Sequence, residues 1–197
     1  MKFRHTTLIF IILSSYSSAH AQENNSQVHT EAIQAQKVAN HFSKIHTMTG
    51  DFLQFNSRGE RTHGTFYLER PGKIRFIYKD SPLRIISDGQ FILVKNTKLN
   101  TLNLYPLQKT PLNLLLSDKI DLRNNLIEFK KEARAITIVL NSNNSIIHMI
   151  FHPKTYELQQ WSMIDQQHIE TTIQIINPRT GVRFAQGTFN IDYQHSK

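Results

Sequence analysis

The chain has 197 residues, enough for one domain or two small ones, with 23 Lys and Arg against 15 Asp and Glu. A hydrophobic content of 39% with 19% charged residues excludes a disordered chain, and the absence of cysteine excludes disulfide scaffolds, thiolate zinc sites and cysteine nucleophiles. No apolar run approaches the roughly twenty residues that a membrane-spanning helix needs.

The N-terminus has the pattern of a cleaved secretory signal. Lys2 and Arg4 precede a short apolar core, and a small-x-small tripeptide ends at Ala21. We expect residues 1–21 to be removed, which leaves 22–197 as a single domain. The residue after the cleavage point is not cysteine, so the protein itself is not expected to be lipidated.

The mature chain begins with a predicted helix over 31–45, with Thr30 as its N-cap. Its apolar residues recur at steps of three and four: Ala35, Val38, Ala39, Phe42 and Ile45. After Gly50 the apolar period changes to two, which predicts β-strands. The first three strand faces carry, in order, Gly50, Phe52 and Gln54, then Gly64, Phe66, Leu68 and Arg70, then Ile74, Phe76 and Tyr78.

The same pattern predicts further strands along the rest of the chain. They are expected at 83–87, 91–94, 102–105, 126–133, 135–140, 146–151, 158–164 and 169–176, with 187–193 as a closing strand. A short leucine-rich helix interrupts them, with Thr110 as its cap and Pro111 at its first position. About ten strands at this spacing predict one antiparallel sheet, coiled or closed into a barrel.

The sequence contains no recognisable catalytic or metal-binding set. No nucleophile elbow, zinc-protease motif or phosphate-binding glycine loop is present. Ser87 precedes Asp88-Gly89, which a hairpin turn explains better than a nucleophile does. His148 and His152 share a strand face but lack a third ligand, so no metal site is predicted. In a secreted chain, the positive net charge suits an anionic membrane surface better than nucleic acid, although it can simply favour solubility.

The predicted strands are unusually rich in large apolar residues. An ordinary barrel core is one interpretation. The other is a cavity, because a coiled sheet of about ten strands is wider than side chains can fill. The two helices would then form a lid. Arg70 shares a face with Phe66 and Leu68, so its guanidinium either caps the strand end in solvent or binds backbone carbonyls of the lid.

Four motifs occur in a characteristic order: Met48-x-Gly50-x-Phe52-x-Gln54, Gly64-x-Phe66-x-Leu68-x-Arg70-Pro71-Gly72-Lys73-x-Arg75-Phe76, Ile85-Ile86-Ser87-Asp88-Gly89 and Thr110-Pro111-Leu112. Together they resemble the periplasmic outer-membrane lipoprotein carrier family, LolA, over about residues 30–189. The resemblance implies a mainly β fold with an α lid. It implies a half-open antiparallel β-barrel of ten or eleven strands, with an N-terminal helix and a short mid-chain lid helix over an apolar cavity.

The resemblance also implies roles for particular residues. The family's lid-latching arginine precedes a proline, which corresponds to Arg70. The acyl-chain cavity is implied at Phe42, Phe52, Ile74, Phe76 and Ile85, and strand alternation adds Phe66 and Leu68. Lid positions correspond to Leu112 and Leu115, while Asn113 stands where the family has an apolar residue.

The function implied by this resemblance is a periplasmic carrier that moves lipoproteins from the inner to the outer membrane. Its partners would be lipoprotein acyl chains, an inner-membrane ABC-type release complex and an outer-membrane receptor where one exists. We expect a monomer with no nucleic-acid partner, cofactor or metal. An envelope sensor of lipids or lipoproteins on the same lidded barrel is the alternative. A secreted enzyme is disfavoured because no catalytic set is present.

Overall fold

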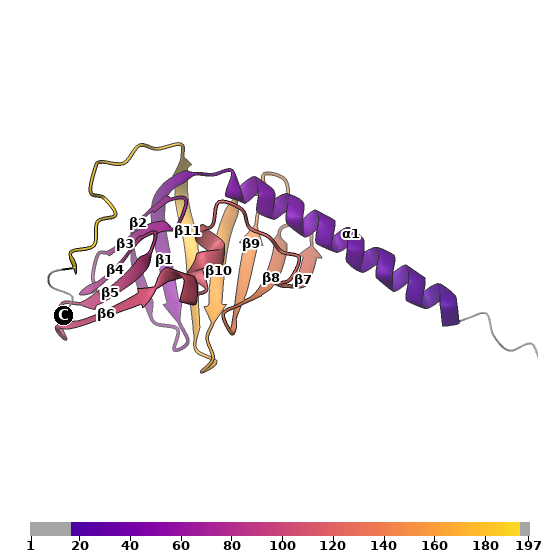
Figure 1. Cartoon of the computed structure of the whole chain (residues 1–197), viewed down its shortest axis with the longest axis horizontal. Coiled ribbons are helices and arrows are strands. Elements are labelled where there is room, and N and C mark those ends of the chain that lie inside the picture. The colour runs from indigo at the N-terminus through magenta and orange to yellow at the C-terminus, as the bar shows by residue number, and fades with distance from the viewer. Residues whose placement is uncertain (1–16, 194–197) are drawn as a thin grey trace, which may run out of the picture.

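The structure, a computed structural model, describes residues 17–193, with side chains from residue 26 onward. Its main element is one eleven-stranded sheet in the order β6-β5-β4-β3-β2-β1-β11-β10-β9-β8-β7 (Figure 1). The strands are β1 (Thr47–Asn56), β2 (Arg61–Glu69), β3 (Lys73–Tyr78), β4 (Leu83–Asp88), β5 (Phe91–Asn96), β6 (Thr101–Pro106), β7 (Leu126–Lys131), β8 (Ile136–Ser142), β9 (Ser145–Phe151), β10 (Leu158–Ile164) and β11 (Glu170–Thr180). Residues 1–16 of the predicted signal lie outside the described residues.

All neighbouring strands are antiparallel, and β1 pairs with β11 to join the two halves of the chain. Within the described part of the chain, β6 and β7 are the sheet's two edges and do not pair with each other. The sheet is therefore half open, which confirms the predicted fold class. The strand expected at 187–193 is absent: Thr188 and Asn190 donate backbone hydrogen bonds to Ala185 and Gly187 within local turns, not across a ladder.

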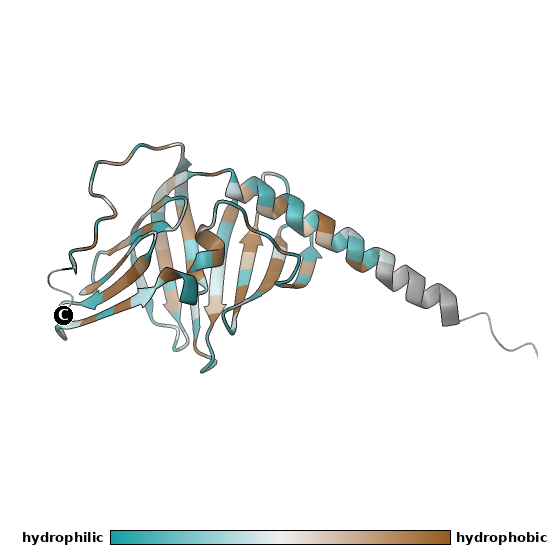
Figure 2. Cartoon of the chain, in the orientation of Figure 1, coloured by the Kyte–Doolittle hydropathy of each residue, from teal (hydrophilic) through white to brown (hydrophobic). Residues whose placement is uncertain are grey.

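Alternating side chains explain why these segments form strands. Along β3, buried residues alternate with partly exposed ones, and β2 has the same pattern from Gly64 onward. Phe66 lies opposite Phe76 in the register of β2 and β3. This pairing collects their apolar side chains on one face of the sheet, the inner face, where they pack with Phe42 of α1 and Leu115 of α2. Figure 2 shows hydrophobic residues recurring along the strands, with both helices lying over the sheet. The predicted alternation is confirmed.

Helix α1 (Ser17–Ser43) is longer than the helix predicted at 31–45. Thr30 is not its N-cap but lies inside it, where the Thr30 hydroxyl donates to the Ser26 carbonyl at 2.8 Å. The N-cap prediction was wrong because a threonine hydroxyl inside a helix can donate to a carbonyl of the preceding turn, and does not only cap the start of a helix. Its buried face starts at Ala35 and ends at Phe42, packed on the inner face.

The second covering element is η1 (Leu107–Lys109) followed by α2 (Leu112–Leu116). Pro111 occupies the N-cap of α2, whereas the Thr110 hydroxyl bonds back to the Leu107 carbonyl at 2.8 Å. Thr110 thus ends η1 and does not cap α2. The N-cap of α2 is Pro111, one residue later than predicted. Leu115 and Leu116 are buried.

The segment 181–193 runs back over the outer face of the sheet. Phe184 contacts the ring of Tyr67 on β2, and Arg75 Nη1 donates to the Thr188 carbonyl at 3.0 Å. Ile191 completes a small buried cluster with Ile86 and Leu93. Phe189 and Ile191, the apolar residues of the strand predicted at 187–193, are therefore buried against the outer face and do not extend the sheet.

Candidate functional site

The predicted cavity residues come together on the inner face of the sheet. The following are no more than 5% exposed: Phe42, Phe52, Phe66, Leu68, Ile74 and Phe76. The Phe52 ring lies edge-on to Phe76 and Tyr78, with both centroid distances 5.1 Å, a favourable aromatic geometry. Ile85 is partly buried beside this cluster.

The interior is divided into two compartments. The inner compartment has a volume of about 20 Å³ and is lined by Phe42, Met48, Phe66, Leu68, Ile74, Leu115, Leu158 and Ile175. The outer compartment has a volume of about 520 Å³, and its apolar lining includes Tyr78, Ile85, Ile92, Val94, Tyr105, Leu112 and Met163. Phe76, Trp161 and Ile173 line both. The inner compartment has room for no more than about one water molecule, whereas the outer compartment has the size of a ligand site.

The side chain of Arg70 is buried, with 5% of its surface exposed. Its Nη1 donates to the carbonyl oxygens of Leu115 and, at 3.0 Å, Ser117, at the end of α2. Its Nε donates to the Ile45 carbonyl at 3.1 Å, in the connection from α1 to β1. The guanidinium carbon lies 4.6 Å from the centre of the Phe42 ring, within cation–π range. One side chain thus connects the end of β2 to both covering helices.

The backbone beside Arg70 makes further bonds to the same elements. The Arg70 N–H donates to the His46 carbonyl at 2.7 Å, and the Gly72 N–H donates to the Leu116 carbonyl at 2.9 Å. Gly72 has φ +76°, and a Cβ there would lie 2.8 Å from Gly89 Cα. The turn therefore requires glycine, both for its backbone conformation and for space.

The Arg70 guanidinium is only partly satisfied. Its Nη2 is buried without a hydrogen-bond partner among the described residues. Burial lowers the pKa of Arg70 to about 10, opposed by the nearby Asp118 carboxylate, so the group remains charged at neutral pH. A buried donor without a partner costs about 1–3 kcal/mol. The closed arrangement is therefore less stable than a fully paired one.

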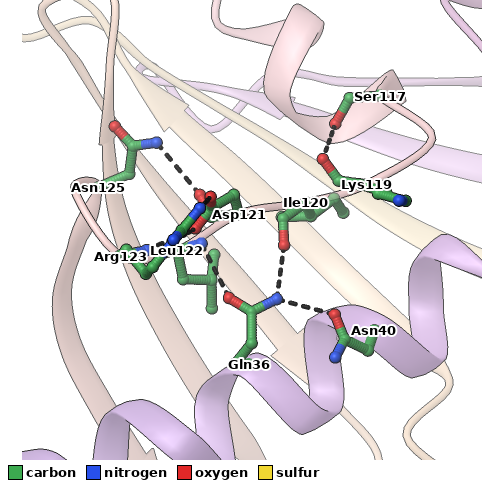
Figure 3. A network of polar contacts seen from close by, with 9 residues as sticks. All are labelled: Gln36, Asn40, Ser117, Lys119, Ile120, Asp121, Leu122, Arg123 and Asn125. Carbon is green, nitrogen blue, oxygen red and sulfur yellow. Dashed lines mark hydrogen bonds and ion pairs between the residues drawn. The ribbon is translucent and has the colours of Figure 1, made fainter.

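A second connection, between α1 and the loop that follows α2, was not predicted from the sequence (Figure 3). Gln36 of α1 donates from Nε2 to the Ile120 carbonyl at 2.7 Å and to Asn40 Oδ1 at 2.8 Å. Its Oε1 accepts from the Leu122 N–H at 3.0 Å. The Gln36 amide thereby pairs with the backbone of the loop after α2, as a neighbouring strand would.

A third connection joins η1 to the turn between β8 and β9. Asn143, which has φ 49°, donates from Nδ2 to the carbonyls of Gln108 at 3.2 Å and Thr110 at 2.9 Å. Arg70, Gln36 and Asn143 together attach the segment 107–122, called the lid here, to three different parts of the fold.

We expect Gln36→Leu to lower the free energy of unfolding by about 1–3 kcal/mol, because the Leu122 N–H and the Ile120 carbonyl lose their partner. Urea denaturation followed by circular dichroism measures this change. Gln34→Leu, at an exposed position on the same helix, should stay within about 0.5 kcal/mol of the unmodified protein. Equal stabilities for the two variants would contradict the role of the Gln36 contacts.

Ser87 and Asp88, which were considered above, have structural partners. Ser87 is fully buried, and its hydroxyl donates to the Gly72 carbonyl at 2.8 Å. Asp88 accepts from the N–H groups of Gln90 and Phe91, as expected for a hairpin turn. Over residues 17–193, the structure shows no group of three or more side chains that could hold a metal ion. None of the helices in this range is both long enough and apolar enough to cross a bilayer.

The comparisons with known proteins agree with this geometry. The family profile described as "Outer membrane lipoprotein carrier protein LolA" matches residues 43–192. No curated protein matches the chain.

Three solved structures match most of this chain at low sequence identity. An uncharacterized conserved protein from Thermus thermophilus has 8% identity and a TM-score of 0.52 over 83% of this chain and 97% of its own. A DUF1329 family protein from Desulfovibrio piger has 9% identity and a TM-score of 0.51 over 85% and 99%. In the Pseudomonas aeruginosa MucA/MucB complex, the matched chain has 12% identity and a TM-score of 0.49, over 83% of this chain but only 62% of that one. Since the LolA profile spans most of the chain, this protein belongs to the LolA family.

Proposed function

We propose that this protein is a periplasmic carrier that shields the acyl chains of lipoproteins and moves them from the inner to the outer membrane. Family membership supports this proposal, as does an apolar interior covered by a lid. The observation that carries it is the Arg70 contact with the lid. The guanidinium is buried and held by backbone carbonyls. The lid can therefore open without the high cost of separating a buried pair of opposite charges, as a carrier that loads and unloads requires.

The energetics explain why a carrier would need such a contact. Burying one CH₂ group stabilises by about 0.8 kcal/mol, so one chain of about sixteen carbons can gain on the order of 12 kcal/mol. A site this favourable would retain its cargo. Closing the empty lid through Arg70 stabilises the unloaded state, which lowers the net affinity for cargo and permits its transfer.

The direction of transfer would come from the partners. We propose that an inner-membrane ABC-type release complex loads the carrier and that an outer-membrane receptor, where present, accepts the cargo. In this scheme residues 1–21 are removed on export and Arg70 is the lid latch. The acyl chains would contact the inner-face residues named above, while Leu112 and Leu115 would cover them.

Native mass spectrometry of the protein purified from the periplasm tests the proposed function. We expect a fraction of the protein to carry one lipoprotein with its acyl chains intact. Reloading the stripped protein with a purified lipoprotein, followed by transfer to isolated outer membranes, provides the matched activity measurement. A protein that never contains lipoprotein, even when its release complex is present, would contradict the carrier function.

A further inference from the structure

The two compartments of the interior differ in their relation to Arg70. The inner compartment is closed by Leu115, whose carbonyl accepts a hydrogen bond from Arg70. The outer compartment is covered by Leu112, at the other end of α2. None of the three carbonyls that bind Arg70 belongs to a residue that lines the outer compartment. A ligand can therefore enter the outer compartment without breaking an Arg70 hydrogen bond.

The outer compartment has the chemistry of a site for a hydrocarbon chain. Ile85, Ile92 and Val94 of β4 and β5 form one apolar wall, and Met163 of β10 contributes to the lining. Ile85, Val94 and Met163 remain partly exposed, which leaves apolar surface that a ligand would remove from water. Lys109 and Asp165 add one charge of each sign to the lining, and the Lys109 ammonium can pair with a carboxylate or phosphate at the polar end of such a ligand.

The volume of this compartment limits what it can hold. A water molecule in the liquid occupies about 30 Å³, and a methylene group is similar in size. The volume of about 520 Å³ therefore corresponds to one long acyl chain and not to the several chains of a lipoprotein. The inner compartment, at about 20 Å³, provides no further room for a chain while the lid is closed.

We propose that the outer compartment binds a single long saturated acyl chain while the Arg70 contacts remain closed, and that opening is required only for further chains. This inference rests on the proposed carrier function and adds an order of events to it. The first chain of a lipoprotein occupies the site beside Leu112 and Val94. The remaining chains then displace the lid from Arg70 and expand the inner compartment.

The lid has a built-in reporter for this order, because the Gly72 N–H donates to the Leu116 carbonyl. Amide hydrogen exchange at Gly72 measures whether the end of α2 stays in place. In the mature protein, we expect palmitate to bind with one-to-one stoichiometry and to change Gly72 exchange less than twofold. A synthetic tripalmitoylated lipopeptide should accelerate it at least tenfold. Palmitate tests the chain alone, and the lipopeptide tests the same chemistry as part of a cargo.

A variant pair tests the location of the site. Val94→Trp places a large ring in the outer compartment and should weaken palmitate binding at least tenfold, as measured by displacement of cis-parinaric acid. Lys95→Trp, one residue along the same strand, should change palmitate binding less than twofold because residue 95 faces the opposite side of the sheet. Thermal unfolding and circular dichroism of both variants verify that they fold.

The inference is overturned if palmitate does not bind, if palmitate accelerates Gly72 exchange as much as the lipopeptide does, or if folded Val94→Trp binds palmitate normally. These failures are distinct from failure of the carrier function. A protein that carries lipoprotein but gives any of these results loses only the proposed order of binding. A protein that binds palmitate as expected but never carries lipoprotein loses the carrier function.

Discussion

Replacing Arg70 with leucine is expected to give a protein that accepts lipoprotein at least as well as the unmodified carrier but releases it at least tenfold more slowly. The substitution removes the donors to Leu115, Ser117 and Ile45, each such charge-assisted bond contributing about 1.5–3 kcal/mol, and it adds apolar surface next to the cargo. Both changes favour the open, loaded state. The measurement is release of a purified lipoprotein from the carrier to isolated outer membranes.

Two further variants define the cause of this effect. Arg70→Lys should be intermediate, because an ammonium group retains the charge but not the planar donor geometry. Arg75→Leu is the matched control, since Arg75 also donates to a backbone carbonyl but on the outer face of the sheet. We expect Arg75→Leu to release cargo normally. Normal release by Arg70→Leu would refute the latch.

Phe76→Asp is expected to abolish binding of lipoprotein and of hydrophobic fluorescent probes. Phe76 is 5% exposed, contacts Phe52 and lines both compartments. A carboxylate at this position would be buried without a partner, or would draw water into the site, and either outcome opposes an acyl chain. Probe titration and lipoprotein solubilisation measure the loss.

The control for this variant lies on the same strand. Ile77 is the neighbour of Phe76 and faces the opposite side of the sheet, so Ile77→Asp should retain probe binding. Phe76→Ala is a second test if the aspartate variant does not fold, with an expected loss of about 3–5 kcal/mol in stability and weaker probe binding. Unchanged binding in folded Phe76 variants would contradict the cavity assignment.

The inner face of the sheet could be predicted from the sequence because its signal is local. The two-residue period places Phe66 and Leu68 of β2, and Arg70 directly after it, on one side without any knowledge of the partner strands. The same parity argument places Ile74 and Phe76 opposite them on β3. For Arg70 the sequence left two interpretations open, a strand end in solvent or a contact with lid carbonyls, and in the structure its guanidinium is buried and donates to backbone carbonyls.

The connections to the lid could not be predicted because they join residues far apart in the chain. Gln36 bonds the backbone at Ile120, and Asn143 bonds it at Thr110, yet each occupies a position typical of an ordinary polar residue. Local pattern also failed at 187–193. Phe189 and Ile191 alternate as strand residues do, but their partners lie on the outer face of the sheet and not along its edge.

The pairing of β1 with β11 has a consequence for how the protein folds. Phe52 of β1 lies opposite Ile175 of β11 in the sheet. In the sequence, however, the strands β2 to β10 all lie between these two residues. The other strand pairs are consecutive in sequence and can form by local closure, whereas this seam requires a long loop to close first. We therefore expect two meanders to form early and the seam to form late. Until β11 pairs with β1, the two halves of the sheet are not joined and the inner face remains open to water, which makes the unfinished chain prone to aggregation.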